Sequence, residues 1–393
     1  MREKVPGLAT ADIEKDLHFS LEEYRQRQAN VRGIMQARDI DVLVVNTPEN
    51  MYYLTGYNTP GYYTEQCLVL PLDGEPIILC RATEEMNVRA TSCLERSDSY
   101  VDDQAPVEVF VGTLRDEGFA RARIGVEKKS WFLTVETYEG LRAGLPDATI
   151  ADGSMIVEQC RMVKSEAEIA CIRRAADIVS VGMKAAVDMI EPGVNEDHVA
   201  AEFNRVVTEM GSEWPGLPPF VVSGTRTSFT HATYAGRVLA DGDPVLLELP
   251  AVVKRYGAAL MRTVFAGTPR AEIQRRVDTG RRALERHLGT VRAGRTPGEV
   301  WRVWAKTLAE DGDAETYRRA GYSIGINYPP DWGEGYIIDI RRGEHRELQT
   351  NMTFHVPSLV KRFGLANVGP SETIRVTDDG CEVLTSYEDS IQV

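Results

Sequence analysis

The chain has 393 residues, of which 43% are hydrophobic and 26% are charged, and its formal net charge is −14. This length predicts two domains, and the composition is typical of a soluble globular protein. The acidic balance disfavours a nucleic-acid or anionic-membrane surface, because such surfaces require clustered lysine and arginine.

Two further absences narrow the class of protein. No apolar run approaches the roughly 20 residues of a membrane span, and the first segment, MREKVPGLATADIEKDLHF, lacks the apolar core of a secretory signal. The six cysteines are scattered without a CxxC pair, a pattern typical of reduced thiols rather than of a disulfide scaffold or zinc ribbon. We therefore expect a cytoplasmic protein with no membrane or nucleic-acid partner.

The first part of the chain predicts an α/β domain over residues 1–157. The segment SLEEYRQRQANVRGIMQARD has helical spacing, with Ser20 and Glu23 placed to form a capping box. Short apolar runs, DVLVVN, QCLVLPL, EPIILC and RIGVE, are typical of buried strands, and SWFLTVETYEGLRAGL predicts another helix.

From residue 158 the pattern changes. The segment EQCRMVKSEAEIACIRRAADIVSVGMKAAVDMI predicts a long amphipathic helical stretch that ends at Pro192 and Gly193. Later helical segments alternate with β-hairpin candidates such as DPVLLELPAVVKRYGAALMRTVFAG. This mixture of long helices and antiparallel strands predicts an α+β domain over residues 158–393.

One of these hairpins poses a chemical question. Residues 246–265, LLELPAVVKRYGAALMRTVF, carry Glu248 in the first arm and no acidic residue in the second. An unpaired buried charge is costly. Glu248 therefore either bonds to backbone at a bulge or awaits a charged ligand, and the residues alone leave both interpretations open.

Five segments, in this order, resemble the creatinase and Xaa-Pro aminopeptidase family. They are CRMVKSEAEIACIRRAADI, LADGDPVLLELPAVVKRYGAALMRTVFAGTP, GYSIGINYPPDWGEG, LQTNMTFHVPSL and ETIRVTDDG. The resemblance spans nearly the whole chain and implies an α/β amino-terminal domain followed by an α+β pita-bread catalytic domain. It also implies a homodimer, in which an aromatic loop reaches the partner's active site. The similar loop here, NMYYLTGYNTPGYYTEQ, offers Tyr62 and Tyr63 as contacts.

The family's peptidases bind two divalent metals through two Asp, one His and two Glu. The resemblance puts Glu248, Ala259, Tyr322, a residue near Pro357, and Ser371 followed by Glu372 at these positions. One carboxylate and no imidazole remain. Hard divalent ions need several oxygen or nitrogen ligands, so we expect neither a metal nor another cofactor.

Metal-free members of the family include creatinases, which hydrolyse a guanidino carbon, and ectoine hydrolases, which open a cyclic amidine. The chain shares GYSIG, YPPDWGE, MTFH and the first-arm Glu with ectoine hydrolases, whereas creatinases carry a Glu where Met261 stands. The resemblance therefore implies a metal-independent hydrolase of an amidine C–N bond, with ectoine, opened to N-acetyl-diaminobutyrate, as the first substrate. The alternatives are a creatinase-like guanidine hydrolase, a Xaa-Pro peptidase-like metalloenzyme and a non-catalytic ligand-binding member.

Hydrolysis without a metal requires a nucleophile or general base and a proton donor for the departing nitrogen. The family positions assign Glu248 to attack the substrate or activate water. They assign His231, in SFTHATYAG, to the proton transfer, which an imidazole performs in both directions near neutral pH. His355, in MTFHVPSL, is the second candidate imidazole and is expected on a strand that faces the same cavity.

The remaining candidates are residues expected to bind the small-molecule substrate. They are His355, Tyr322, Asp331, Trp332, Glu334, Arg262 and Glu372, together with Tyr62 and Tyr63. Acidic and aromatic groups in the GYSIGINYPPDWGEG loop suit a delocalised cation, although its prolines could merely stiffen a turn while Trp332 packs on the domain. Arg262 either binds a substrate carboxylate or braces acidic neighbours.

Overall fold

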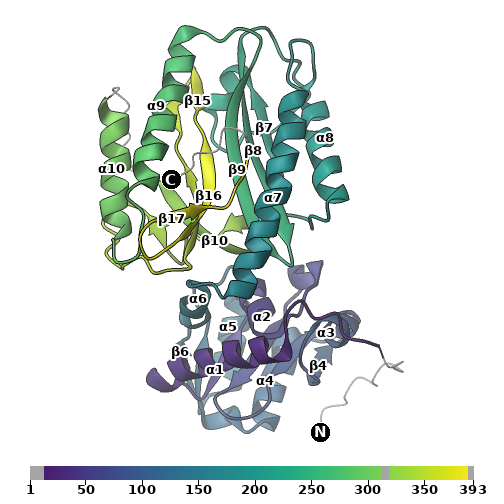
Figure 1. The fold of residues 1–393 in the computed structure, drawn as a ribbon. Helices are drawn as coiled ribbons and strands as arrows, with labels where there is room; N and C mark the ends of the chain where they lie inside the picture. Colours follow the sequence, from purple (N-terminus) through teal and green to yellow (C-terminus); the bar gives the residue numbers. More distant parts are fainter. Residues whose placement is uncertain (1–12, 311–317, 388–393) are drawn as a thin grey trace. The chain divides into compact units, whose positions relative to one another are not determined.

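The computed structural model describes residues 13–310 and 318–387, which divide into two compact units, 1–161 and 162–393 (Figure 1). Each unit has its own main sheet and hydrophobic core. The predicted order, an α/β domain followed by an α+β domain, is confirmed. Within the described residues, no helix is long and apolar enough to cross a membrane.

The first unit is a mixed six-stranded sheet with helices. Its strands are β1 (Val42–Val45), β2 (Cys67–Pro71), β3 (Ile77–Arg81), β4 (Ser97–Tyr100), β5 (Arg123–Val126) and β6 (Thr149–Asp152), in the order β4-β3-β2-β1-β5-β6. Its α-helices are α1 (Leu21–Ala37), α2 (Pro48–Thr55), α3 (Glu85–Thr91), α4 (Pro106–Asp116), α5 (Val135–Gly144) and α6 (Ile156–Arg161). Every residue of β1 and β2 is buried, as apolar runs in a covered sheet should be.

A buried acid ties the middle of this sheet to α2. Glu127 follows β5, and its carboxylate accepts hydrogen bonds from the backbone N–H groups of Asn46 and Thr47, each at 2.8 Å. Asn50 donates to the same carboxylate at 2.6 Å and to Glu158 at 3.1 Å. Burial, reinforced by the charge of Glu158, raises the pKa of Glu127 to about 7.

Helix α6 belongs to the first unit, so the division falls between Arg161 and Met162, whereas the helical pattern had placed it after residue 157. Arg161 is buried and donates to Asn50 at 2.6 Å, which fixes α6 to the first unit. The long helical stretch is interrupted after Arg161 and resumes at Glu166, where Ser165 and Glu168 form a capping box.

In its described residues, the second unit has an antiparallel main sheet and four α-helices. Its helices are α7 (Glu166–Asp188), α8 (Glu196–Glu209), α9 (Ala271–Leu288) and α10 (Pro297–Glu310). Its strands are β7 (Phe220–Ser223), β8 (Asp243–Val253), β9 (Tyr256–Ala266), β10 (Gly321–Tyr328), β11 (Asp331–Gly333), β12 (Asp339–Ile340), β13 (Thr353–Pro357), β14 (Val360–Arg362), β15 (Ala366–Val368), β16 (Ser371–Val376) and β17 (Cys381–Val383).

The main path of this sheet is β17-β16-β13-β10-β9-β8-β7, and β14 pairs separately with β15. Helix α7 packs on the β8–β9 hairpin, while α9 and α10 pack together (Figure 1). The segment expected to be a loop, GYSIGINYPPDWGEG, forms two strands, β10 and β11, which pair on either side of Pro329–Pro330. All of β10 is buried, so its side chains lie on a rigid sheet.

A buried histidine near the end of α9 makes the second unit sensitive to acid. His287 is fully buried, and neither ring nitrogen has a hydrogen-bond partner within residues 13–310 and 318–387. Burial lowers its pKa to about 3, because the charged ring would lose its hydration. The unfolded chain binds this proton near pH 6.5. The contribution of the neutral ring to stability is therefore complete above about pH 6.5 and is lost as the pH falls toward 3.

We expect His287→Leu to remove this acid sensitivity. Below about pH 6.5, the free energy of unfolding of the wild type should fall by on the order of 1.4 kcal/mol per pH unit more than that of the variant. Urea unfolding, followed by tryptophan fluorescence at pH values on both sides of 6.5, measures the difference. His345→Leu, at an exposed histidine, is the control and should follow the wild type. Equal pH slopes for wild type and His287→Leu would contradict the assignment.

Candidate active site

The site is built on the β8–β9 hairpin. Glu248 lies in β8 opposite Met261 of β9 and Phe220 of β7. Its strand neighbours are buried, while its own side chain keeps 17% exposure. The carboxylate therefore lies among buried apolar residues of the sheet and keeps partial access to solvent.

A chain of hydrogen bonds runs beside Glu248. His355 of β13 lies opposite Tyr322 of β10, and its Nδ1 is 2.7 Å from the Tyr322 hydroxyl and 3.9 Å from Glu248 Oε1. Its Nε2 is 2.6 Å from the Ser371 hydroxyl, and Trp332 Nε1 donates to the Tyr322 hydroxyl at 2.8 Å. The structure thus brings together Glu248, His355, Tyr322 and Trp332.

The indole fixes the direction of one of these bonds, and the other two are assigned to agree with it. Because Trp332 Nε1 can only donate, the Tyr322 oxygen accepts from it, and we assign the phenol proton to the bond with His355 Nδ1. His355 then carries its proton on Nε2 and donates to Ser371. Burial, assisted by the positive charge of Arg319, lowers the pKa of His355 to about 3, and burial raises the pKa of Tyr322. The chain is therefore neutral at physiological pH.

Aromatic rings connect this chain to His231. Phe220 contacts Trp332 edge-on, with ring centroids 5.3 Å apart, and stacks on His231 at 5.8 Å. His231 is exposed and has a positive φ of 59°. It lies in a loop, as predicted, and its ring stacks directly on Phe220, the residue opposite Glu248 in the β7–β8 ladder.

The charge of Glu248 is poorly compensated. Burial raises the pKa of this carboxyl group to about 7, the positive charges of Lys361 and Arg319 oppose the rise, and the charge of Asp331 adds to it. Arg319 stacks on the ring of Tyr322, 4.4 Å from its centroid, and pairs with Asp339 at 3.2 Å. Near neutral pH, Glu248 exchanges easily between its two protonation states.

The residues present do not fit the pair of divalent metals that the resemblance associates with this fold. Ala259, opposite Pro250, contributes only a methyl group, and its backbone N–H and C=O are bound by the Thr373 hydroxyl. Both nitrogens of His355 are engaged in hydrogen bonds. Within the described ranges, no three His, Cys, Asp or Glu side chains converge as a metal-binding group.

Three predicted substrate contacts are engaged elsewhere. Arg262 is buried and donates to Glu372 at 2.7 Å and to the Ser371 carbonyl at 2.7 Å. The bracing alternative therefore describes this pair better than contact with a substrate. Glu334 pairs with Lys164 at 2.9 Å, with each side chain 1% exposed, and accepts from the Ile326 N–H at 3.1 Å. Its carboxylate is already satisfied within the protein.

The two predicted aromatic contacts in the first unit differ from each other. Tyr62 is half-buried and lies edge-on to Phe132 at 5.6 Å, whereas Tyr63 is 80% exposed. The Tyr63 ring therefore does not pack in the core of the first unit. Its contact with a partner chain stays a prediction.

Three residues beside the site were not among the predicted ones. Phe220 occurs in the unremarked strand FVVS, Arg319 directly precedes AGYSIG, and Lys361 lies in β14. Only Arg319 had a signal in the sequence, because it adjoins a segment already singled out. Phe220 lies near Glu248 because β7 pairs with β8, and Lys361 lies near it because β14 and β15 form a hairpin. Neither pairing can be read from a single sequence.

Comparison with known proteins agrees with this architecture. Residues 170–380 match the model of metallopeptidase family M24, and residues 27–163 match the creatinase/prolidase N-terminal domain. The chain is 32% identical to ectoine hydrolase of Halomonas elongata, over 95% of this chain and 98% of that one. It is 33% identical to an uncharacterized hydrolase/peptidase of Sinorhizobium fredii, over 94% and 97% respectively.

Solved structures with the same fold include the prolidase of Pyrococcus horikoshii, with a TM-score of 0.81 at 20% identity, covering 93% of this chain and all of that one. The Xaa-Pro dipeptidase of Bacillus anthracis superimposes with a TM-score of 0.80 at 20% identity, covering 94% and 99%. At this identity the likeness concerns the fold. The family match, together with the 32% identical relative, supports a hydrolase. With its creatinase/prolidase amino-terminal domain and its pita-bread second domain, this chain belongs to the M24 family.

Proposed function

We propose that the protein is a metal-independent hydrolase that opens the ring of ectoine or a closely related cyclic amidine. The observation that carries this proposal is the isolated carboxylate of Glu248, which occupies a metal-ligand position of the family without the other ligands. The relative named ectoine hydrolase supports the choice of substrate.

The chemistry fits a cationic substrate. A protonated amidine already has an electrophilic central carbon, so it needs a Lewis acid less than a neutral peptide does. Its positive charge pairs with Glu248, and the faces of aromatic residues around the site favour a delocalised cation. Ectoine also carries a carboxylate, for which Arg319 and Lys361 supply positive charge beside Glu248.

Glu248 either attacks the amidine carbon or removes a proton from the attacking water. When Glu248 is the base, water adds directly to the amidine carbon. When Glu248 is the nucleophile, loss of the ring nitrogen leaves a covalent adduct, which water then hydrolyses to free the carboxylate. In both cases one ring C–N bond breaks as its nitrogen is protonated, and one water molecule is consumed. His231 is assigned to this proton transfer, since His355 is neutral, buried and already bonded at both nitrogens. The products are an amide and a free amine.

A creatine-like guanidine combines the same cation and carboxylate, so it is the second candidate substrate.

The direct test is to incubate the purified protein with ectoine, hydroxyectoine, creatine and Xaa-Pro dipeptides and to follow each by proton NMR. We expect ring opening of ectoine and no cleavage of dipeptides. Cleavage of a dipeptide, with ectoine left intact, would refute the proposal.

Glu248→Gln should abolish turnover, because the amide is neither a nucleophile nor a base. We expect kcat to fall by about 10²–10⁴ while calorimetry still detects substrate binding. His231→Ala should lower kcat more than it raises KM. Glu347→Gln, at an exposed carboxylate, is the control and should retain activity. A near-normal kcat for Glu248→Gln would exclude this residue from the chemistry.

The raised pKa of Glu248 predicts the pH profile. If the free enzyme needs the ionised carboxylate, kcat/KM should fall below about pH 7 with the protonation of Glu248. Lys361→Met removes a charge that lowers this pKa and should move the midpoint to higher pH. Asp331→Asn removes a charge that raises it and should move the midpoint to lower pH. Unmoved midpoints in both variants would assign the profile to another group.

A further inference from the structure

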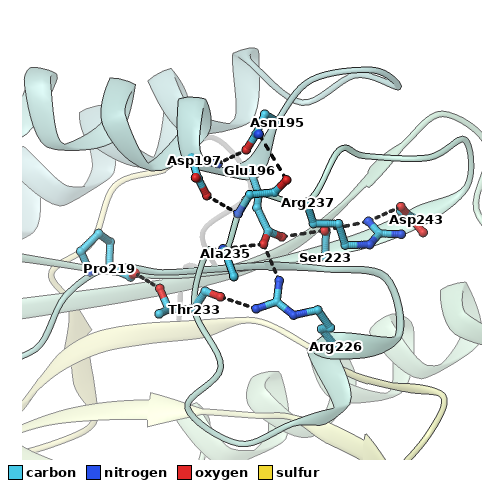
Figure 2. Close-up of polar contacts among 11 residues, drawn as sticks. Asn195, Glu196, Asp197, Pro219, Ser223, Arg226, Thr233, Ala235, Arg237 and Asp243 are labelled. Carbon is cyan, nitrogen blue, oxygen red and sulfur yellow. Dashed lines mark hydrogen bonds and ion pairs between the residues drawn. The ribbon is translucent and has the colours of Figure 1, made fainter.

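Another buried carboxylate contacts the loop that carries His231. Glu196 is the first residue of α8 and is fully buried. Its Oε2 accepts from the Ser223 hydroxyl at 2.7 Å, and its Oε1 accepts from the guanidinium of Arg226 and, at 2.8 Å, from the N–H of Ala235 (Figure 2). One carboxylate therefore joins the residues before and after His231.

The two stems of this loop are also tied to each other. Arg226 donates to the carbonyl of Thr233 at 2.7 Å, and the Thr233 hydroxyl donates to the Pro219 carbonyl at 2.9 Å (Figure 2). Beyond them, Arg237 bridges Ser223 at 2.8 Å and Asp243 at 2.6 Å. These contacts converge on the Glu196–Arg226 pair.

The tip of the loop is held at residues beside His231 rather than at His231 itself: Gly364 N–H donates to the Ser228 hydroxyl at 3.1 Å, and Phe229 contacts the ring of Phe363. His231 is exposed, and the tip's backbone bonds include Phe229 N–H to Arg226 C=O at 2.9 Å and Ala232 N–H to Phe229 C=O at 3.4 Å. The stacking of the His231 ring on Phe220 is a weak contact for a side chain that must hold one position. The place of the imidazole therefore depends on how the rest of the loop is fixed, and the two stems carry most of its polar contacts among the described residues.

From this geometry we propose that Glu196 is a positioning residue for His231. It acts by holding Arg226 and Ala235, and hence both stems of residues 224–237. The amide of glutamine has nearly the shape of the carboxylate but no charge, so Glu196→Gln removes the ion pair with Arg226. A buried ion pair that loses one partner leaves an uncompensated charge, so Glu196→Gln should release the loop. The kinetic part of this inference rests on the proposed function.

A double-mutant cycle tests the coupling. We expect Glu196→Gln to lower kcat at least about tenfold, with KM changed less than about twofold. In the His231→Ala background, the same substitution should change kcat by less than about twofold, because the group on which it acts is gone. Glu209→Gln is the matched control, since Glu209 lies on the same helix and pairs with Arg205 at the surface. It should leave kcat unchanged.

Hydrogen exchange tests, without any substrate, whether the contacts of Glu196 with Arg226 and Ala235 hold the loop. Amides of residues 224–237 should exchange faster in Glu196→Gln than in the wild type, while those in the middle of α7 exchange at the wild-type rate. If Glu196→Gln does not fold, Arg226→Gln removes the same ion pair at its half-buried arginine. It should give the same faster exchange over residues 224–237.

The outcomes separate the two proposals. Full additivity of Glu196→Gln and His231→Ala, or unchanged exchange over residues 224–237, would overturn the positioning role. A wild-type protein that leaves both ectoine and hydroxyectoine intact would overturn the proposed function, and hydrogen exchange would still decide whether Glu196 fixes the loop.

Discussion

The site depends on one constraint, which is that a single carboxylate stands in an apolar sheet without a full counter-charge. Burial raises the pKa of Glu248 to about 7. In the protein without substrate, this carboxyl group is therefore only partly ionised near neutral pH. A bound amidinium ion would favour the ionised form, and by linkage the ionised form would favour the bound cation. Substrate binding and activation of Glu248 would then be one event. Neutral peptides would gain nothing from this coupling.

The groups around Glu248 form a completed hydrogen-bond chain. Trp332, Tyr322, His355 and Ser371 satisfy one another, and Arg262 supports the chain through the Ser371 carbonyl. A fully satisfied buried network is rigid. The chain is therefore fixed and neutral. In the function that we propose, Glu248 changes its charge and His231, on a more exposed loop, transfers the proton.

The sequence was sufficient for the two-domain architecture, for the hairpin with Glu248 and for the strand with His355. It was insufficient where register or burial decides the outcome. Strands β4 and β6 are short, partly polar edge strands, so they lack the apolar runs that identified β1 and β2. The segment GYSIGINY contains glycine, serine and asparagine, which suggested a loop, yet pairing with β9 and β13 makes it a fully buried strand. Phe220 reaches the site only because β7 pairs with β8.

The requirement for metal tests the account most directly. The protein would be dialysed against a chelator, its residual metal content measured by mass spectrometry, and its turnover of ectoine compared with that of the untreated protein. The ligand set around Glu248 predicts full turnover without metal and no gain from added Mn²⁺ or Fe²⁺. Loss of turnover on chelation, with recovery when either ion is returned, would contradict the account.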